Sequence, residues 1–230
     1  QNGTAMAGSD YIATSGSLSF APGEVLKTVK VALLNDAVAE ASEAFNLVLS
    51  GLTGATGADL VGTAVIGAND NAAVTKSNIL VDDIVVDEST GYADFLVRLD
   101  APNNTVVTVS YNTSGAIAAS GYDFTAQSGT LTFAAGETVK TVRIGMLNDT
   151  TVEATENFNL VLSNPSTNAT LARTVATASI IDNDAASGTP SIAINDFVID
   201  ESTKEATFVV SLNKPSSVAV SVNYATQNGT

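Results

Sequence analysis

The fold of this chain is decided by the stretch NDTTVEATENFNLVLS, residues 148–163. In its second half the apolar residues Phe158, Leu160 and Leu162 alternate with other side chains. Successive side chains of a β-strand point to opposite faces, so every second residue lines the same face. The pattern therefore predicts a strand that turns one face to a core.

Three carboxylates, Asp149, Glu153 and Glu156, precede this strand with the spacing D-x-x-x-E-x-x-E. The same spacing occurs 113 positions earlier, in NDAVAEASEAFNLVLS, residues 35–50. The acids of this earlier copy are Asp36, Glu40 and Glu43. An acidic loop that leads into a strand, once per repeat, is the main functional signal of the sequence.

The repeat extends well beyond this stretch. Asp83–Tyr111 aligns with Asp196–Tyr224 at the same offset of 113 residues, and QNGT at residues 1–4 recurs at residues 227–230. A period of this length corresponds to a whole domain rather than to one turn of a solenoid. We therefore expect the chain to begin and end at the same point of the repeat.

Three segments follow from this alignment. Residues 1–72 are expected to be the C-terminal part of one repeat, residues 73–189 a complete repeat, and residues 190–230 the N-terminal part of a further repeat. Each end segment by itself would expose unpaired strand edges. We expect residues 190–230 to complete residues 1–72 of a neighbouring copy, head to tail, or a longer polypeptide to complete both ends.

The complete repeat reads as β-structure throughout. About seven short alternating segments follow one another, and turn residues such as Ala135-Gly136-Glu137 and Ser163-Asn164-Pro165 separate them. No window of useful length has a helical period. The predicted fold class is all-β, with tandem immunoglobulin-like antiparallel β-sandwiches.

Composition excludes several functions. The chain of 230 residues has a net charge of −15, from 24 acids and 9 bases, which argues against a nucleic-acid partner. It contains no Cys and no His, so disulfides, zinc sites with thiolate or imidazole ligands, and Ser-His-Asp catalysis are excluded. No apolar run of about 20 residues is present, so this segment is not expected to insert into a membrane. Metal cations are the natural partners of surplus carboxylates.

The acids are placed where a sandwich would gather its loops. Those of the complete repeat that we expect to converge at one tip are Glu88, Asp123, Asp149, Glu153, Glu156, Asp182 and Asp184. Unneutralised carboxylates side by side would raise each other's pKa, and a hard cation with six to eight oxygen ligands removes that cost. Calcium suits an irregular loop-built site better than magnesium, which demands octahedral geometry.

Simpler interpretations stay open. The Asp149–Glu156 segment is also consistent with a solvated acidic loop, and Asp182-Asn183-Asp184 with a linker turn. Two carboxylates would suffice for a glycosidase. An active site copied in every repeat is rare, however, so no enzymatic activity is expected.

Several motifs in fixed order resemble the Calx-β domain, known from sodium/calcium exchangers and large bacterial surface proteins. They are GYDF at 121–124, SGTLTF at 128–133, the acidic loop from Asn148 to Glu156, and Asp182-Asn183-Asp184. The first repeat has matching marks around Asp10 and Asp70, and the resemblance covers essentially the whole chain.

The resemblance implies calcium bound at the loop end of each sandwich. The implied ligands of the complete repeat are Glu88, Asp123, Asp149, Glu153, Glu156, Asp182 and Asp184, and those of the end segments are Asp10, Asp36, Glu40, Glu43, Asp70 and Glu201. Asn148 and Asn183 stand where family members often carry acids, and Ala68 stands in place of Asp182. These departures imply fewer ions or weaker binding.

The expected function is a calcium-binding structural segment of a long extracellular repeat protein, of a bacterial cell surface, that forms a semi-rigid stalk or filament. Its expected partners are adjacent repeats or copies of itself. Two alternatives stay open: an adhesin module that binds a protein or carbohydrate, and a regulatory calcium-sensing domain.

Overall fold

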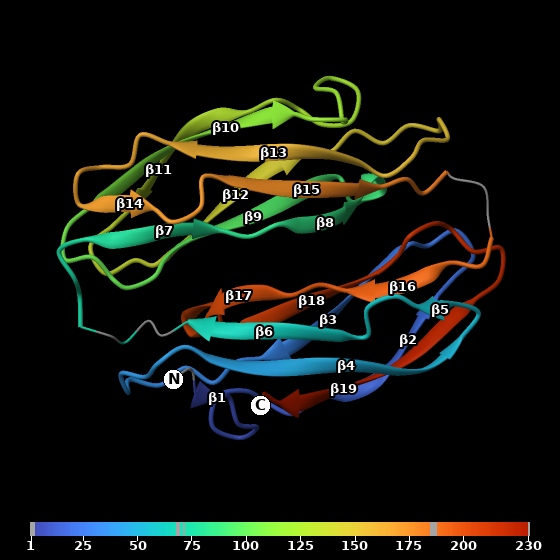
Figure 1. Ribbon diagram of the computed structural model, residues 1–230, viewed down its shortest axis with the longest axis horizontal. Helices are drawn as coiled ribbons and strands as arrows, with labels where there is room; N and C mark the ends of the chain where they lie inside the picture. Colours follow the sequence, from blue (N-terminus) through green and yellow to red (C-terminus); the bar gives the residue numbers. More distant parts are fainter. Residues whose placement is uncertain (1–2, 68–69, 71, 185–187, 230) are drawn as a thin grey trace.

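A computed structural model describes residues 3–67, 70, 72–184 and 188–229 (Figure 1). The described chain forms two β-sandwiches that lie side by side, with both chain ends in the same sandwich. Apart from strands, it contains only the two short 3-10 helices η1 (Glu88–Thr90) and η2 (Glu201–Thr203). None of its helices has the length and apolar character needed to cross a membrane. The predicted all-β sandwich class is confirmed.

The central sandwich is built from the middle of the chain. Its first sheet has the order β11 (Ser128–Phe133), β10 (Val107–Gly115), β13 (Glu156–Ser163), β15 (Val175–Ile181) and β8 (Ile84–Asp87). Its second sheet has the order β12 (Val139–Gly145), β9 (Tyr92–Leu99), β7 (Ser77–Val81) and β14 (Ala169–Leu171). Pairing is antiparallel except at two edges, where β8 runs parallel to β15 and β14 parallel to β7.

The composite sandwich combines the two end segments of the chain. Its first sheet has the order β2 (Ser15–Phe20), β19 (Val220–Asn228), β4 (Glu43–Thr53), β6 (Val61–Gly67) and β17 (Phe197–Asp200), with β1 (Gly3–Thr4) beside β4. Its second sheet has the order β3 (Leu26–Ala32), β18 (Glu205–Leu212), β16 (Ser191–Ile194) and β5 (Thr56–Gly57). Apart from β1, this is the strand order of the central sandwich.

In this single chain the two end segments pair with each other. Strand β19 pairs with both β2 and β4 of the same chain, and β18 pairs with β3. Residues 188–229 thus return to the sheets formed by residues 3–67 of the same chain (Figure 1). Pairing between copies stays a prediction.

The cores repeat the same aromatic contacts. In the central sandwich the Phe158 ring stacks on Phe124 at 4.3 Å between centroids and meets Phe95 edge-on at 5.9 Å. In the composite sandwich Phe45 takes the place of Phe158; its partners are Tyr11 at 4.2 Å and Phe208 at 5.7 Å. The alternating residues of the acidic stretch, Phe158, Leu160 and Leu162, are buried as predicted. These contacts fix β13 and β4, and therefore the start of each strand where the acids lie.

The two sandwiches touch through equivalent strands. Val85 and Leu96 of the central sandwich pack against the core of the composite one. The amide of Val198 donates a 3.3 Å hydrogen bond to Oδ2 of Asp82. A cavity of about 690 Å³ between them is lined by β8 and β9 on one side and β17 and β18 on the other. Each repeat therefore offers the same face to its neighbour.

Candidate metal centre

The first acidic group of the central sandwich begins where β8 ends. Asp87 caps η1: its carboxylate accepts hydrogen bonds from the amide and hydroxyl of Ser89, both 2.7 Å. This cap sets the direction of Glu88, whose side chain lies inward and is only 6% exposed. Gly91 ends the turn with a φ of 77°, a left-handed conformation that glycine adopts without strain. Local turn chemistry thus places a carboxylate below the surface.

Asp182 brings two other loops to the same place. It follows β15, is 5% exposed, and accepts hydrogen bonds from the amides of Asp184 (2.6 Å) and Glu153 (2.7 Å). One carboxylate oxygen from each of Glu88, Asp182 and Asp184 lies within 4.8 Å of the others. We call these three residues the inner group.

A second trio lies at the same tip. One oxygen from each of Asp123, Glu153 and Glu156 lies within 4.8 Å of the others, and we call these residues the outer group. Glu153 links the groups, because its backbone amide binds Asp182 of the inner group. Six of the seven acids predicted for this tip therefore fall into two adjoining groups.

Asp149 is the exception. Its Oδ1 accepts a hydrogen bond from the amide of Thr151, and this backbone contact lowers the pKa of Asp149. Neither group includes it. Its charge still reaches both, since it adds to the rise in the pKa of Glu88 and Glu153.

The electrostatics of the tip disfavour full ionisation. Burial, followed by the charges of Asp182 and Asp184, raises the pKa of Glu88 to about 7. Burial and the charge of Asp123 raise the pKa of Glu156 and of Glu153. In addition, Oε1 of Glu88 is buried and has no hydrogen-bond partner. A buried acceptor without a partner is costly, so this oxygen marks a place for a cation or a proton.

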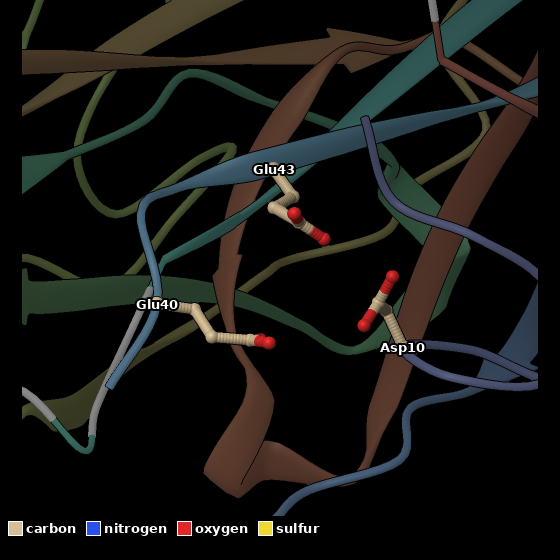
Figure 2. Close-up of side chains that lie close together, drawn as sticks. All are labelled: Asp10, Glu40 and Glu43. Atoms are coloured by element: carbon tan, nitrogen blue, oxygen red, sulfur yellow. The ribbon is translucent and has the colours of Figure 1, made fainter. Parts of the chain in front are cut away.

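The composite sandwich has one such trio among its described residues. Asp10, Glu40 and Glu43 offer oxygens within 4.8 Å of one another, and Figure 2 shows their carboxylates directed into a common space. We call them the Asp10 group; it corresponds to the outer group. Burial, a hydrogen bond with Asp10 and the Asp10 charge raise the pKa of Glu43 to about 7. Burial and the charges of Asp10 and Asp36 raise the pKa of Glu40.

The other predicted acids of this sandwich are not brought into a trio. Asp36 accepts a 2.6 Å hydrogen bond from the amide of Val38, as Asp149 does from Thr151. Glu201 is buried in η2, in the place of Glu88, and Oδ2 of Asp70 is buried without a hydrogen-bond partner. Ala68, the expected gap in this site, lies outside the described residues.

One candidate ligand oxygen, that of the Asn183 side chain, was not predicted from the sequence. Asn183 donates from Nδ2 to Oδ1 of Asn148 at 3.3 Å, while its own Oδ1 is buried without a partner. From the sequence, Asn148 and Asn183 were interpreted only as positions where a carboxylate ligand is missing. An amide oxygen is an ordinary calcium ligand, and the position of Asn183 between two aspartates was the available signal.

The donor set as a whole fits one class of ion. It consists of carboxylate and amide oxygens, and the chain has no thiol or imidazole. Oxygen-only groups on irregular loops suit hard divalent cations with flexible coordination.

Comparison with known proteins finds one family model and several relatives. A family model described as the Calx-beta domain matches residues 1–75, 69–184 and 186–230. The chain is 30% identical to adhesion G-protein coupled receptor V1 of Danio rerio over 100% of this chain and 4% of the receptor. It is 32% identical to sodium/calcium exchanger 1 of Felis catus and 30% identical to sodium/calcium exchanger 3 of Rattus norvegicus. Those alignments cover 72% of this chain and 19% and 20% of the exchangers. The chain thus spans a fifth or less of each relative.

Solved structures give partial matches. The apo form of the Calx CBD1 domain is 28% identical, covers 46% of this chain and 97% of that chain, and has a TM-score of 0.45. The structure titled calcium binding domain CBD12 of CALX1.1 is 29% identical, covers 46% of each chain, and also has a TM-score of 0.45.

Proposed function

The chain belongs to the Calx-beta domain family, and on this premise we propose that both its sandwiches bind calcium at their loop tips. The observation that carries the proposal is Oε1 of Glu88, buried without a hydrogen-bond partner beside Asp182 and Asp184. Three carboxylates in such a place repel one another when ionised. A bound cation supplies the opposite charge and the missing partner together.

Calcium is the ion that these residues fit best. Magnesium demands near-ideal octahedral geometry and keeps several waters, whereas calcium accepts six to eight oxygens in irregular arrangements. The residues of the inner and outer groups come from four separate loops, so their oxygens are not placed by one regular element. The Asn183 amide oxygen adds to the acids as a further neutral donor.

The two tips differ in capacity. The central sandwich has an inner and an outer group, whereas the described part of the composite sandwich has only the Asp10 group. We expect the central tip to bind more ions, and more tightly, because ligand number and charge set calcium affinity.

At the level of the whole protein, we propose a semi-rigid stalk or filament outside the cell, of the kind found in large bacterial surface proteins. The support is the 113-residue repeat, which recurs along the whole chain as it does in a tandem array. Extracellular modules bind calcium at about 0.1–1 mM, and saturation would add roughly 1–2 kcal/mol per site. Adjacent repeats, or copies of the chain, are the proposed partners.

A second candidate is a regulatory calcium sensor, favoured by the exchanger relatives. A sensor would change the arrangement of its two sandwiches when calcium binds, whereas a stalk would keep it. Small-angle scattering of the chain with millimolar calcium and with EGTA separates the two.

Thermal unfolding of the full chain and of a Glu88→Gln variant, with millimolar calcium and with EGTA, tests calcium binding at the tip of the central sandwich. The substitution would keep the shape of the side chain but remove the buried charge. At alkaline pH without calcium the variant should be at least as stable as the wild type, because it lacks an uncompensated carboxylate. With calcium the order should reverse.

Glu137→Gln is the matched control, since Glu137 pairs with Lys140 at a partly exposed site on the turn before β12. Its melting temperature should rise with calcium as the wild type's does. If the wild-type chain melts at the same temperature with calcium and with EGTA, the proposal is wrong.

A further inference from the structure

One contact ties the Asp10 group to the far end of the chain. The hydroxyl of Tyr11 donates a 2.7 Å hydrogen bond to Oδ1 of Asn228, and the amide of Ala7 donates to the same oxygen at 3.1 Å. Tyr11 is 1% exposed and stacks on Phe45. Asn228 is the last residue of β19 and pairs with Phe45 of β4. The bond therefore joins the loop before β2 to a strand at the other end of the sequence.

The same loop holds Asp10 in place. Oδ2 of Asp10 accepts a 2.6 Å hydrogen bond from the amide of Met6, and the amide of Asp10 donates to the carbonyl of Met6 at 3.0 Å. The amide of Gly8 donates to the carbonyl of Tyr11 at 2.8 Å. Asp10 and Tyr11 thus belong to one small hydrogen-bonded loop, so a shift of one residue moves the other.

The central sandwich has the loop without the tie. Phe124 replaces Tyr11 and stacks on Phe158 in the same way, and Gly121 donates its amide to the carbonyl of Phe124 at 2.8 Å. Gly115 stands in the register position of Asn228, opposite Phe158. The repeats therefore differ in a matched pair: hydroxyl with amide in one, and neither group in the other.

We propose that Tyr11 and Asn228 are positioning residues that couple cation binding at the Asp10 group to the docking of the end of β19. The inference rests on the proposed calcium function. A cation held by Asp10, Glu40 and Glu43 draws the Asp10 loop toward the start of β4. Through Tyr11, the same loop holds Asn228 beside Phe45. Each event then favours the other by the same factor, because coupling between two sites is reciprocal.

Hydrogen–deuterium exchange of the full chain during a calcium titration tests the coupling, since each loop reports its own site. In the wild type, calcium should increase protection both in residues 5–14 and in residues 220–228. Tyr11→Phe, which copies Phe124, should weaken calcium binding at residues 5–14 by about two- to tenfold, the range for one lost neutral hydrogen bond. It should also remove the calcium-dependent protection of residues 220–228.

Two further variants act as controls. Asn228→Gly, which copies Gly115, removes the bonds from Tyr11 and from Ala7 together, so it should weaken calcium binding at least as much as Tyr11→Phe does. The double variant should weaken binding little beyond Asn228→Gly, because the Tyr11 bond is already lost in that variant. Phe124→Tyr adds a hydroxyl opposite a glycine and should leave the calcium midpoint of residues 118–127 unchanged.

The outcomes separate the two proposals. If calcium protects residues 5–14 with the same midpoint in the wild type and in Tyr11→Phe, the coupling is refuted while calcium binding stands. The coupling is equally refuted if Tyr11→Phe exposes β19 to the same extent with and without calcium, which would show a structural role only. If calcium alters exchange in none of the loops, the proposed function itself fails and the coupling with it.

Discussion

The backbone amide of Glu153 donates a 2.7 Å hydrogen bond to Oδ2 of Asp182, 29 residues further along the chain. Oδ1 of the same carboxylate accepts from the amide of Asp184. Asp182 is therefore both a member of the inner group and the support of the outer one. We therefore expect replacement of Asp182 to disturb both groups.

Asp182→Ala should destabilise the central sandwich even without calcium. Two part-buried backbone amides would lose their acceptor, which costs on the order of 1–3 kcal/mol for each group that stays unsatisfied. The calcium-dependent rise in the melting temperature of the central sandwich should also be smaller than in the wild type. Differential scanning calorimetry in EGTA and in calcium measures both effects. A loss of calcium response with unchanged stability in EGTA would contradict the supporting role.

The stability of the calcium-free protein should fall as pH rises from about 4.5 to 7. The pKa of Glu88 is raised to about 7 in the folded protein from an ordinary value of 4.5, so the folded state holds a proton that the unfolded state has lost. That proton stabilises the folded state below pH 4.5 relative to pH 8, by at most about 3 kcal/mol. Glu43 in the composite sandwich acts in the same direction.

Calcium should reverse this trend, because it binds the ionised carboxylates and competes with the proton. Urea unfolding at a series of pH values between about 5 and 8, with calcium and with EGTA, gives the comparison. Glu88→Gln should flatten the part of the EGTA curve that Glu88 contributes. A rise in stability with pH in EGTA would show that the carboxylates are already compensated within the protein.

Asn103→Ala should destabilise the central sandwich without changing its calcium affinity. Asn103 is fully buried at the end opposite the acids, where its Nδ2 donates to Oγ of Ser77 and to the carbonyl of Asn168. Loss of this network is expected to cost about 1–3 kcal/mol. Calorimetric titration of the folded variant should give the wild-type calcium affinity. A weaker affinity would mean that the two ends of the sandwich are coupled.

Phe158→Ala should disrupt one sandwich and spare the other. The ring is fully buried and contacts Phe95 and Phe124, and such a truncation typically costs about 3–5 kcal/mol. Phe45→Ala is the matched variant of the composite sandwich. Hydrogen exchange should show lost protection in the central strands for the first variant and in β4, β18 and β19 for the second. Equal loss in both sandwiches for either variant would indicate a single cooperative unit.

Most of the fold could be predicted because the same pattern of alternating apolar residues occurs in both repeats. The alternation at Phe158, Leu160 and Leu162 recurs in the equivalent stretch of residues 45–49, and all six positions are buried in the structure. Periodicity of two fixes which face is buried, and the 113-residue offset fixes the domain size. Neither fixes which chain supplies the missing strands, because β19 would make the same hydrogen bonds with β4 of its own chain or of another.

The site was predicted less completely, for a local reason. Sequence spacing showed which acids reach the tip, but it did not show which of them bind their own loop instead. Asp149 and Asp36 each accept a hydrogen bond from an amide two residues on, and short aspartate side chains favour such turns. The tie between Tyr11 and Asn228 was equally hidden, since Tyr11 reads as a core aromatic. Only its comparison with Phe124 and Gly115 in the folded chain distinguishes it.

Isothermal titration of calcium into the full chain near neutral pH, for the wild type, Glu88→Gln and Glu137→Gln, tests whether the inner group binds calcium. We expect saturable calcium binding in the wild type and in Glu137→Gln. Glu88→Gln should lose the tightest binding step and keep the weaker ones. Absence of binding heat at millimolar calcium, or the same isotherm for Glu88→Gln and the wild type, would contradict the assignment of the inner group as a calcium site.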